Sequence, residues 1–439
     1  MKVFIVAVPL FDSNMAVQAY RLCDRSGEKA IGIQNDFRRM TEALISPGLD
    51  LIEKVGLEPF AGDKPLFTDV NQFKLLTEAL TYMSIDPAKL VCVLPGQAPF
   101  DDYALGKCRR LRALGYTLAL DSFPAAGNKH PLIPLISYLL MDYQEPQFFA
   151  QYKTVNIDLP DIRPIITNIP DTESYQVLSR NRLALFTGGF YNQPITEGIK
   201  EISPVKVNAL QLLNQVNSKD FEFADVSRII ERDPYLTISL LRFINSAAVG
   251  LSNKVESIHS AVTLLGQIEV RRWATVAISV SLAEDRPGEI TKLSLTRAKL
   301  AENLAGPFGL SALQSSLFLT GLFSLLDVIL EKPMVEAIND VAVDKWVREA
   351  LVEKSGDLAA VLELIYTYER ADWDKVSILI IKKGISLDDV NKAFVDAIIW
   401  YGQILETIDA EKNSPKNSDA GKSAAPNRRT GDGRKKSAR

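Results

Sequence analysis

The hydrophobic pattern of this 439-residue chain changes its period near Ile195, and this change constrains the fold most. Before it, short apolar runs alternate with stretches of helical spacing, which is typical of parallel strands joined by crossover helices. After it, apolar residues recur at helical spacing to about Leu405, without strand-like alternation. The chain is also too long for one compact core. We therefore predict an α/β domain over residues 1–195 and an all-α domain over 196–408.

Six apolar runs are predicted strands of the first domain: Val3–Val8, Leu66–Val70, Leu90–Leu94, Tyr116–Leu120, Ile136–Met141 and Leu183–Phe186. Helical spacing between some of them predicts helices at Asp36–Leu44, Asn71–Met83 and Asp102–Leu114. Gly115 follows the last helix, where glycine is a common helix stop. This alternation favours a barrel or an open sheet.

The second domain carries helix signals of its own. Apolar residues repeat at helical spacing over Val205–Val216 and Phe223–Ile230. Asp233 is a predicted N-cap, with Pro234 at the first helical position, where its missing N–H costs nothing. The stretch Ser386–Asp389 resembles a capping box.

Beyond Asp409 the sequence has no hydrophobic face, so 409–439 is a predicted disordered tail. From Glu411 to Arg439 nine Lys/Arg stand against three Asp/Glu, a net charge of +6 (9 − 3), which leaves −10 (−4 − 6) on the rest. An acidic body argues against a nucleic-acid-binding core. The basic tail could contact nucleic acid, acidic lipid or an acidic protein, but we favour a solubilising appendage.

Several features predict a cytoplasmic protein without membrane attachment. The apolar run Val3–Val8 is too short for a signal-peptide core. The longest uncharged run, Asn303–Leu326, could span a bilayer by length, but Pro307 and several polar residues favour a buried core helix. Three cysteines show neither metal-type nor secreted-type spacing: Cys23, Cys92 and Cys108.

Common catalytic patterns are missing from the sequence. The only histidines, His130 and His259, lie far apart in unrelated contexts, and no familiar metal-binding spacing surrounds them. We predict that His259 is exposed at a helix start and that His130 lies in a loop. The sequence contains neither a Gly-rich phosphate loop after a strand nor a Gly-x-Ser-x-Gly elbow.

Four motifs of the first 195 residues resemble the EAL domain in order and spacing. Val8–Asp12 and Ala19–Leu22 resemble its opening strands, Leu120–Phe123 its Leu-Asp-Asp-Phe motif, and Thr187–Pro194 its closing motif. The resemblance implies a TIM-like β/α barrel. It also implies cyclic-di-GMP phosphodiesterase chemistry, in which two divalent cations clamp the phosphodiester.

The residues which that chemistry requires are replaced at the matching positions. Arg21 stands for the first metal-binding Glu, Asp69 for an Asn, and an apolar run near Val93 for the next Glu. Ser122 replaces the second Asp of a pair, and Leu140 replaces the catalytic Lys. A cation at position 21 would repel a metal ion.

Only Asp121 and Asp142 survive of the implied ligand set, and the segment between Tyr175 and Leu183 is shortened. Two carboxylates do not make a two-metal site. We therefore predict no metal, no other cofactor and no catalysis. For Asp121 and Asp142 we favour strand-end residues paired with backbone or an Arg over contact with a nucleotide.

The second domain resembles the HDOD domain over about fifty residues, in Ile229–Pro234, Leu240–Ala247, Ile258–Gly266 and Val270–Trp273. True HD hydrolases would carry His-Asp where this chain has Leu326-Asp327. The resemblance implies a helical domain that lacks HD-type catalysis and occurs with signalling partners.

The HDOD signature residues are candidates for a structural role or partner contact: Asn245, Ser246, Gly266, Arg271, Arg272 and Trp273. For Asn245-Ser246 we favour a role in fixing a helix end or a buried hydrogen bond over ligand binding, and for the two arginines we favour surface cations beside an inward-facing Trp273. A buried stripe is predicted at Leu236, Leu240, Leu241 and Ile244, and ordinary helix-surface positions at Glu302, Asp327 and Glu331.

Together these features predict a shortened, modified β/α barrel followed by an all-helical HDOD domain, as in EAL–HDOD signalling proteins of the YuxH type. We expect a non-catalytic signal-transduction protein, a regulatory scaffold that contacts other signalling proteins. Two alternatives stay open. The first is a cyclic-di-GMP receptor without hydrolysis, with Arg21 on a phosphate; the second, ranked last, is a cyclic-di-GMP phosphodiesterase.

Overall fold

A computed structural model describes residues 5–24, 47–70, 83–98, 100–194, 204–218, 221–245, 254–283 and 287–412, with single residues 75, 80 and 249. The predicted helix Asp36–Leu44, most of Asn71–Met83 and the tail beyond Lys412 lie outside these residues. The predicted domain boundary at 195 also falls in a gap between described residues.

Eight strands close into a barrel in chain order, which answers the question that the sequence left open. They are β1 (Ile5–Phe11), β2 (Val17–Asp24), β3 (Leu66–Asp69), β4 (Leu90–Leu94), β5 (Thr117–Leu120), β6 (Tyr138–Asp142), β7 (Arg163–Ile169) and β8 (Leu185–Gly188). Strand β1 is antiparallel to both neighbours, whereas β2 to β8 pair in parallel. The six predicted strands are confirmed, with ends shifted by a few residues. The apolar pattern did not predict β7, which contains Pro164, Thr167 and Asn168, or β2, which was expected only from the resemblance of Ala19–Leu22 to an EAL strand.

Alternate residues of each strand face the inside of the barrel, as the two-residue period of a strand requires. The inside-facing side chains form one separate apolar cluster: Leu10, Ala19, Phe67, Val91, Val93, Ala119, Leu140, Ile165 and Leu185. The barrel is therefore packed like the core of a TIM-type barrel rather than hollow.

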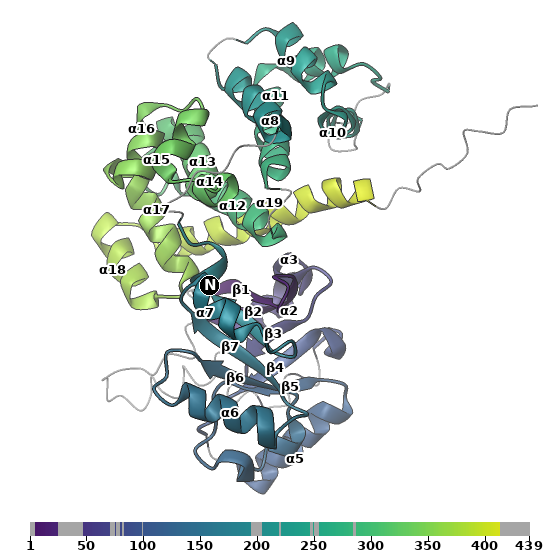
Figure 1. The fold of residues 1–439 in the computed structure, drawn as a ribbon, viewed down its shortest axis with the longest axis vertical. Coiled ribbons are helices and arrows are strands. Elements are labelled where there is room, and N and C mark those ends of the chain that lie inside the picture. Colours follow the sequence, from purple (N-terminus) through teal and green to yellow (C-terminus); the bar gives the residue numbers. More distant parts are fainter. Residues whose placement is uncertain are drawn as a thin grey trace, which may run out of the picture.

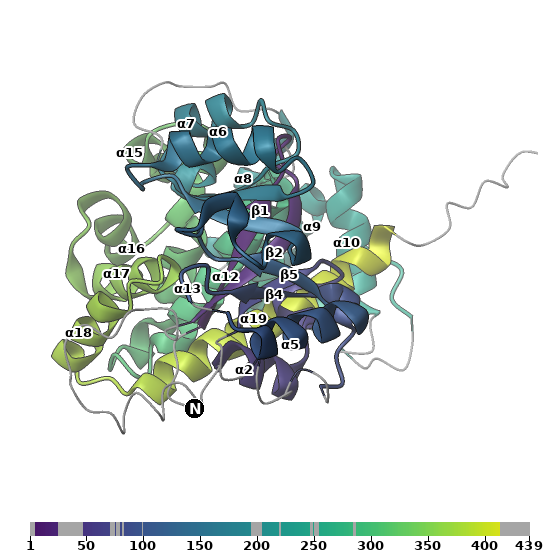
Figure 2. The ribbon, with the colours of Figure 1, turned by 90° about the horizontal axis from the view of Figure 1, so that it is seen from below.

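Five described helices accompany the barrel: α2 (Pro47–Val55), α3 (Glu58–Ala61), α5 (Asp102–Ala113), α6 (Phe148–Asp158) and α7 (Thr172–Leu178). Figures 1 and 2 show α5 and α6 on its outer side. The Asp101 carboxylate caps α5 by accepting a 2.8 Å hydrogen bond from the Ala104 N–H. Gly115 follows α5 with φ of 98°, which confirms the predicted stop.

From residue 204 onward, every regular element that the structure describes is helical, as predicted. The helices are α8 (Pro204–Asn217), α9 (Phe223–Glu231), α10 (Pro234–Ile244), α11 (Ile258–Leu282), α12 (Gly288–Leu304), α13 (Gln314–Leu322), α14 (Leu326–Leu330), α15 (Met334–Ala337), α16 (Lys345–Arg348), α17 (Gly356–Glu369), α18 (Trp373–Lys383) and α19 (Leu387–Lys412). Short 3-10 turns lie at Pro87–Lys89, Gly127–Lys129, Ile133–Leu135, Gly189–Tyr191, Ser311–Leu313, Phe323–Leu325 and Ile338–Asp340, and a π-turn at Glu349–Glu353.

The predicted caps are confirmed. The Asp233 carboxylate accepts a 3.2 Å hydrogen bond from the Leu236 N–H at the start of α10. At the start of α19, the Ser386 hydroxyl accepts from the Asp389 N–H at 3.1 Å and donates to its carboxylate at 2.7 Å. These side chains satisfy backbone donors that the first turn of a helix leaves free.

The long uncharged run is largely buried from Leu317 onward, but it is not the single core helix that the sequence predicted. It contains the end of α12, all of α13, the start of α14 and two 3-10 turns, Ser311–Leu313 and Phe323–Leu325. Within the described residues, Ser311–Leu330 is the one segment long and apolar enough to cross a membrane, and 67% of its apolar window is buried inside the protein. The segment therefore has the character of a core element.

The helical part packs against one side of the barrel (Figure 1). Helix α19, drawn in yellow, contacts α10 and α12 of the helical part and α3 of the barrel. Helix α17 contacts strand β1. The barrel and the helices therefore share a continuous interface.

Candidate functional site

The candidate site lies at the carboxyl end of the parallel strands, where β/α barrels carry their active sites. Four polar residues stand there, each two positions after an inside-facing apolar residue of its own strand: Arg21, Asp69, Asp121 and Asp142. The structure therefore places these four predicted site residues at one end of the barrel, which we call the mouth. Ser122 follows Asp121 directly, just beyond β5.

Arg21 is held by an ion pair with Asp69. One guanidinium nitrogen, Nη2, lies 3.2 Å from the Asp69 Oδ1, and the two side chains are about equally shielded, with 21% and 23% exposed. Burial by itself lowers the pKa of Arg21, but the Asp69 carboxylate, with Asp121 further away, raises it above its ordinary value. Arg21 is therefore a fixed positive charge within the site, held beside Asp69.

The Asp121 carboxylate is used to fix a loop. Its Oδ1 accepts hydrogen bonds from the Gly96 N–H at 2.7 Å and from the Ser122 hydroxyl at 2.8 Å. Residue 96 must be glycine, because a Cβ there would collide with the Ser122 carbonyl oxygen. Asp121 thus ties the loop after β4 to the end of β5.

Asp142 plays a similar role at the end of β6. Its Oδ1 accepts from the Gln144 N–H at 2.9 Å, and its Oδ2 accepts from the Asn168 amide at 2.8 Å. Asn168 lies on β7 with φ of 58°, a left-handed conformation that asparagine tolerates better than most residues. Asn168 is a site residue that the sequence did not reveal.

These residues do not fit a pair of divalent cations. The site contains the positive charge of Arg21. The apolar side chains of Val93 and Leu140 fill the barrel interior, and each is 1% exposed. Among the described residues, no group of three His, Cys, Asp or Glu side chains is placed to hold a metal ion. Hard cations require several oxygen ligands around one point, and this donor set does not supply them.

The two histidines lie in unrelated surroundings, His130 in the segment between β5 and β6 and His259 on α11. His259 is exposed near the start of α11, as predicted. His130 lies between two 3-10 turns, and burial lowers its pKa. Its Nδ1 accepts a 3.3 Å hydrogen bond from the Leu132 N–H, which is a local structural contact.

Asn245 supports the helical part as a hydrogen-bonding bridge. Its amide nitrogen donates to the carbonyl oxygens of Leu241 and Val255, at 2.6 and 2.8 Å, and its Oδ1 accepts from the Val255 N–H at 2.8 Å. The side chain joins the end of α10 to the segment before α11, as the favoured interpretation required. Ser246 lies outside the described residues.

The other signature residues also have structural surroundings. Gly266 has φ of 73° and breaks α11 into two helical segments. Arg271 donates a 2.9 Å hydrogen bond to the Ser218 carbonyl oxygen and lies over the Phe221 ring, whereas Arg272 is largely exposed and paired with Glu269. Trp273 is buried, with 7% of its surface exposed, which confirms its inward orientation.

The comparisons with known proteins agree with this architecture. The family model described as "HDOD domain" matches residues 202–346. The chain carries an HDOD domain.

Two curated proteins extend the similarity beyond the HDOD domain. "Uncharacterized protein YuxH" of Bacillus subtilis (strain 168) is 28% identical over 422 residues, which cover 92% of this chain and 100% of YuxH. "Cyclic di-GMP phosphodiesterase CdgJ" of Vibrio cholerae serotype O1 is 25% identical over 409 residues, covering 92% of this chain and 94% of CdgJ. A solved EAL domain protein from Listeria monocytogenes EGD-e superposes with a TM-score of 0.34 and 12% identity, over 44% of this chain and 88% of that one. A closed barrel before an HDOD domain fits an EAL–HDOD organisation.

The HDOD domain contacts the barrel through two polar residues near the start of α12, Glu289 and Lys292. The Tyr20 hydroxyl of β2 donates a 2.7 Å hydrogen bond to the Glu289 carboxylate. The Lys292 ammonium lies 3.7 Å from the centre of the Tyr20 ring and 3.4 Å from the Phe60 carbonyl oxygen. Burial, and then the charge of Glu289, raise the pKa of Tyr20, so this tyrosine stays protonated.

A second tyrosine clamps strand β1 from the helical side. The Tyr368 hydroxyl of α17 donates to the Ile5 carbonyl oxygen at 3.0 Å and accepts from the Ile5 N–H at 3.2 Å. Nearby, Arg297 of α12 forms a bidentate pair with Glu369, at 2.8 and 2.6 Å, and donates to the Ser324 hydroxyl at 3.1 Å. No local sequence signal links residues this far apart in the chain, so the sequence did not reveal this network.

Two expected helix-surface positions of the HDOD domain are shielded instead: the Glu302 side chain is only 11% exposed and pairs with Lys299, and Asp327 is buried. Asp327 is not on a helix surface: it lies in α14 with 4% of its surface exposed. Its helix forms part of the buried apolar run, where Leu326 and Val328 are also buried. An isolated acid in a helical stretch is exposed by default, and only the packing of α14 overrides that default.

Proposed function

We propose that this protein acts in cyclic-di-GMP signalling without hydrolysing the dinucleotide, as an adaptor that contacts other signalling proteins. The observation that carries the proposal is the Arg21–Asp69 ion pair at 3.2 Å, in the place where an EAL enzyme would hold its first metal ion. The similarity to YuxH and CdgJ supports the connection to cyclic-di-GMP.

The absence of hydrolysis is argued from charge and donor number. A metal ion near Arg21 would face a guanidinium whose pKa is raised by its acidic neighbours, so the repulsion persists at any physiological pH. The remaining carboxylates, Asp121 and Asp142, already accept hydrogen bonds that position loops. Their free lone pairs alone supply too few oxygen donors to hold two divalent cations beside a guanidinium.

Hydrolysis is tested with the purified full chain, cyclic-di-GMP and either Mg²⁺ or Mn²⁺, with the linear dinucleotide as the measured product. We expect no metal-dependent product above the level of a D121A/D142A variant. Turnover that disappears in that variant would refute the proposal and favour the phosphodiesterase, the activity named for CdgJ.

A second candidate is a receptor that binds the dinucleotide intact. Arg21 favours it, because the guanidinium keeps donors beyond the one bonded to Asp69 and arginine pairs well with phosphate. Calorimetry at micromolar protein tests this candidate, with Arg21→Gln as the variant and Arg272→Gln as a control at an exposed arginine far from the mouth. Heat that is lost in Arg21→Gln alone would establish the receptor; no heat with any of the three proteins would eliminate it.

A further inference from the structure

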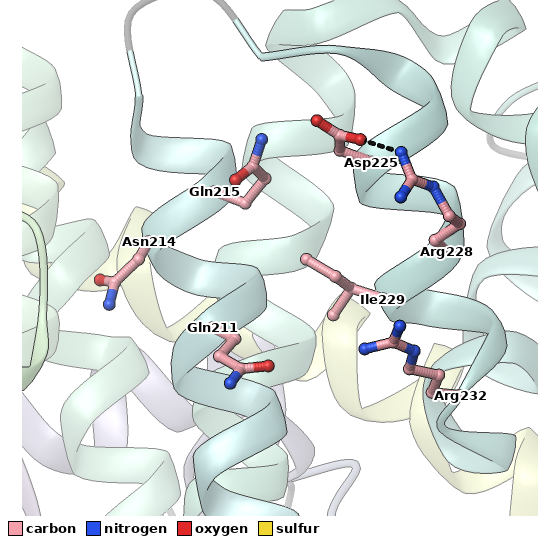
Figure 3. A pocket seen from close by; sticks show the side chains of 7 residues that line it. All are labelled: Gln211, Asn214, Gln215, Asp225, Arg228, Ile229 and Arg232. Atoms are coloured by element: carbon pink, nitrogen blue, oxygen red, sulfur yellow. Dashed lines mark hydrogen bonds and ion pairs between the residues drawn. The ribbon is translucent and has the colours of Figure 1, made fainter.

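A groove of about 480 Å³ lies in the HDOD domain between α8 and α9 (Figure 3). Helix α8 contributes one wall with three amide side chains, and α9 contributes the other wall with three charged side chains. The amides are Gln211, Asn214 and Gln215; the charged residues are Asp225, Arg228 and Arg232. None of these residues takes part in the barrel mouth or in the contacts between barrel and helices described above.

The groove is locally positive on a chain of net charge −4. Two arginines line it against a single aspartate. Arg228 pairs with Asp225, but 67% of the arginine side chain and 41% of the aspartate side chain are exposed, so this pair is weak and readily exchanged. The Arg232 side chain is exposed, and no ion pair involves it among the residues that the structure describes.

The spacing of the two arginines suits an extended chain. Arg228 lies on α9 and Arg232 caps the end of that helix in a helical conformation, so the two are one turn apart, which places such side chains roughly 6 Å apart. Alternate side chains of an extended peptide repeat at roughly 6.6 Å, so carboxylates at every second residue can meet both guanidinium groups. Each pair would be charge-assisted, the stronger kind of hydrogen bond.

The opposite wall offers partners for a peptide backbone. Gln211 and Gln215 are also one turn apart, on α8, and each amide both donates and accepts. Figure 3 shows their side chains on the α8 side of the groove, opposite Arg228 and Arg232. A chain lying between the walls can therefore pair its backbone on one side and its acidic side chains on the other.

The walls are fixed before any partner arrives. The Asn214 amide donates to the Asp340 carbonyl oxygen at 2.9 Å and accepts from the Ala342 N–H at 2.7 Å, which anchors α8 to a distant loop. On α9, Val226 and Ile230 are fully buried beneath the exposed arginines. Fixed walls lower the entropy that binding must overcome.

We infer that this groove binds an extended acidic segment of a partner protein, with carboxylates at alternate residues. The inference rests on the proposed adaptor function, because it names the chemistry of one contact that such an adaptor makes. It does not depend on the barrel mouth, so the hydrolysis assay and the experiment below can fail independently.

The test uses the full chain and a fluorescein-labelled peptide of alternating Glu and Ser, followed by fluorescence anisotropy at low salt. We expect saturable binding that weakens about tenfold or more in R228Q/R232Q, the loss of two charge-assisted contacts. The matched control is R272Q, since Arg272 is equally exposed, at 64%, and ion-paired to Glu269 in the same domain, but lies outside the groove. Its affinity should equal that of the unchanged protein.

Four results would overturn the inference. They are no saturable binding of the Glu-Ser peptide, equal binding of a Lys-Ser peptide, an equal loss of affinity in R272Q, and equal competition by a single-stranded oligonucleotide of the same charge. The last result would identify a general anion site instead of a peptide site. Urea unfolding of each variant verifies that lost binding does not reflect a lost fold.

Discussion

The Tyr20 hydroxyl donates a 2.7 Å hydrogen bond to the Glu289 carboxylate, and this contact joins the barrel to the HDOD domain across 269 residues of sequence. Both side chains are buried, at 7% and 6% exposure. Tyr20 directly precedes Arg21 on β2, and alternation along the strand points the two side chains to opposite faces. One strand thus carries a charged residue of the mouth and a central residue of the interface.

Removing this hydrogen bond should destabilise the protein. In Tyr20→Phe the buried Glu289 carboxylate loses a donor, at an expected cost of about 1–3 kcal/mol. All four tryptophans lie after residue 196, so their fluorescence follows the helical part alone, whereas far-UV circular dichroism follows both domains. We expect the two urea transitions to coincide in the unchanged protein and to separate in the variant. Tyr103→Phe is the control, because Tyr103 is 61% exposed and should leave both transitions unchanged.

The buried tyrosines make stability fall at high pH. Burial raises the pKa of Tyr20, Tyr191 and Tyr368 above the ordinary value of 10.0. Their contribution is fully present below pH 10 and is lost as the pH rises above it, because the unfolded chain then releases protons that the folded chain keeps. Urea midpoints between pH 8 and 11 measure this slope, which should be shallower in Tyr20→Phe. A stability that is flat to pH 11 would contradict the prediction.

Breaking the Arg297–Glu369 pair should be costly. The Arg297 side chain is 6% exposed, so Arg297→Met leaves a largely buried carboxylate and should lower the free energy of unfolding by about 3–5 kcal/mol. The matched control is Lys375→Met. Its partner Glu363 lies on α17, the helix that also carries Glu369, but the two side chains of this pair are half exposed, at 50% and 52%. That variant should change stability by no more than about 0.5 kcal/mol. The double variant R297M/E369M should recover much of the loss; if it does not, lost packing rather than unpaired charge explains the effect.

Replacing Gly266 should destabilise the protein because of its backbone conformation. Its φ of 73° with ψ of 169° lies where side chains are strained, so Gly266→Ala should cost about 1–3 kcal/mol although nothing stands in the way of a Cβ. Gly106 lies inside α5, also with free space around a Cβ, but without a positive φ. Gly106→Ala should therefore stabilise the protein by up to about 1 kcal/mol. Equal effects of the two substitutions on the urea midpoint would argue against the kink.

The three thiols should differ in reactivity. Burial raises the pKa of Cys92 to about 12 and that of Cys108 to about 11, whereas Cys23 is only half-buried. Because the thiolate is the reactive form, we expect a disulfide reagent at pH 8 to modify one thiol of the folded protein and all three in urea. Cys23→Ser should abolish the reaction of the folded protein. Rapid modification of two or three thiols without urea would contradict the burial of β4 and α5.

Local sequence signals identified most elements of this protein, because strand and helix periods, caps and stops act over a few residues. Asp233, Gly115 and Ser386 act as predicted for that reason. The positions of Arg21, Ser122 and Leu140 on or just beyond their strands were also predicted from the sequence, since the motifs around them fix their places. The pattern of β7 was weaker, because Pro164 and Asn168 interrupt its apolar alternation.

Only the tertiary structure decided four features of this protein. They are the closure of the barrel, the burial of Asp327, the contact of Tyr20 with Glu289 and the contact of Tyr368 with Ile5. Each joins residues that no local period relates. The pairing of β1 with β8, and of one domain with the other, is chosen by the packing of whole surfaces. Sequence therefore determined which groups the chain possesses, and the fold decided which of them meet.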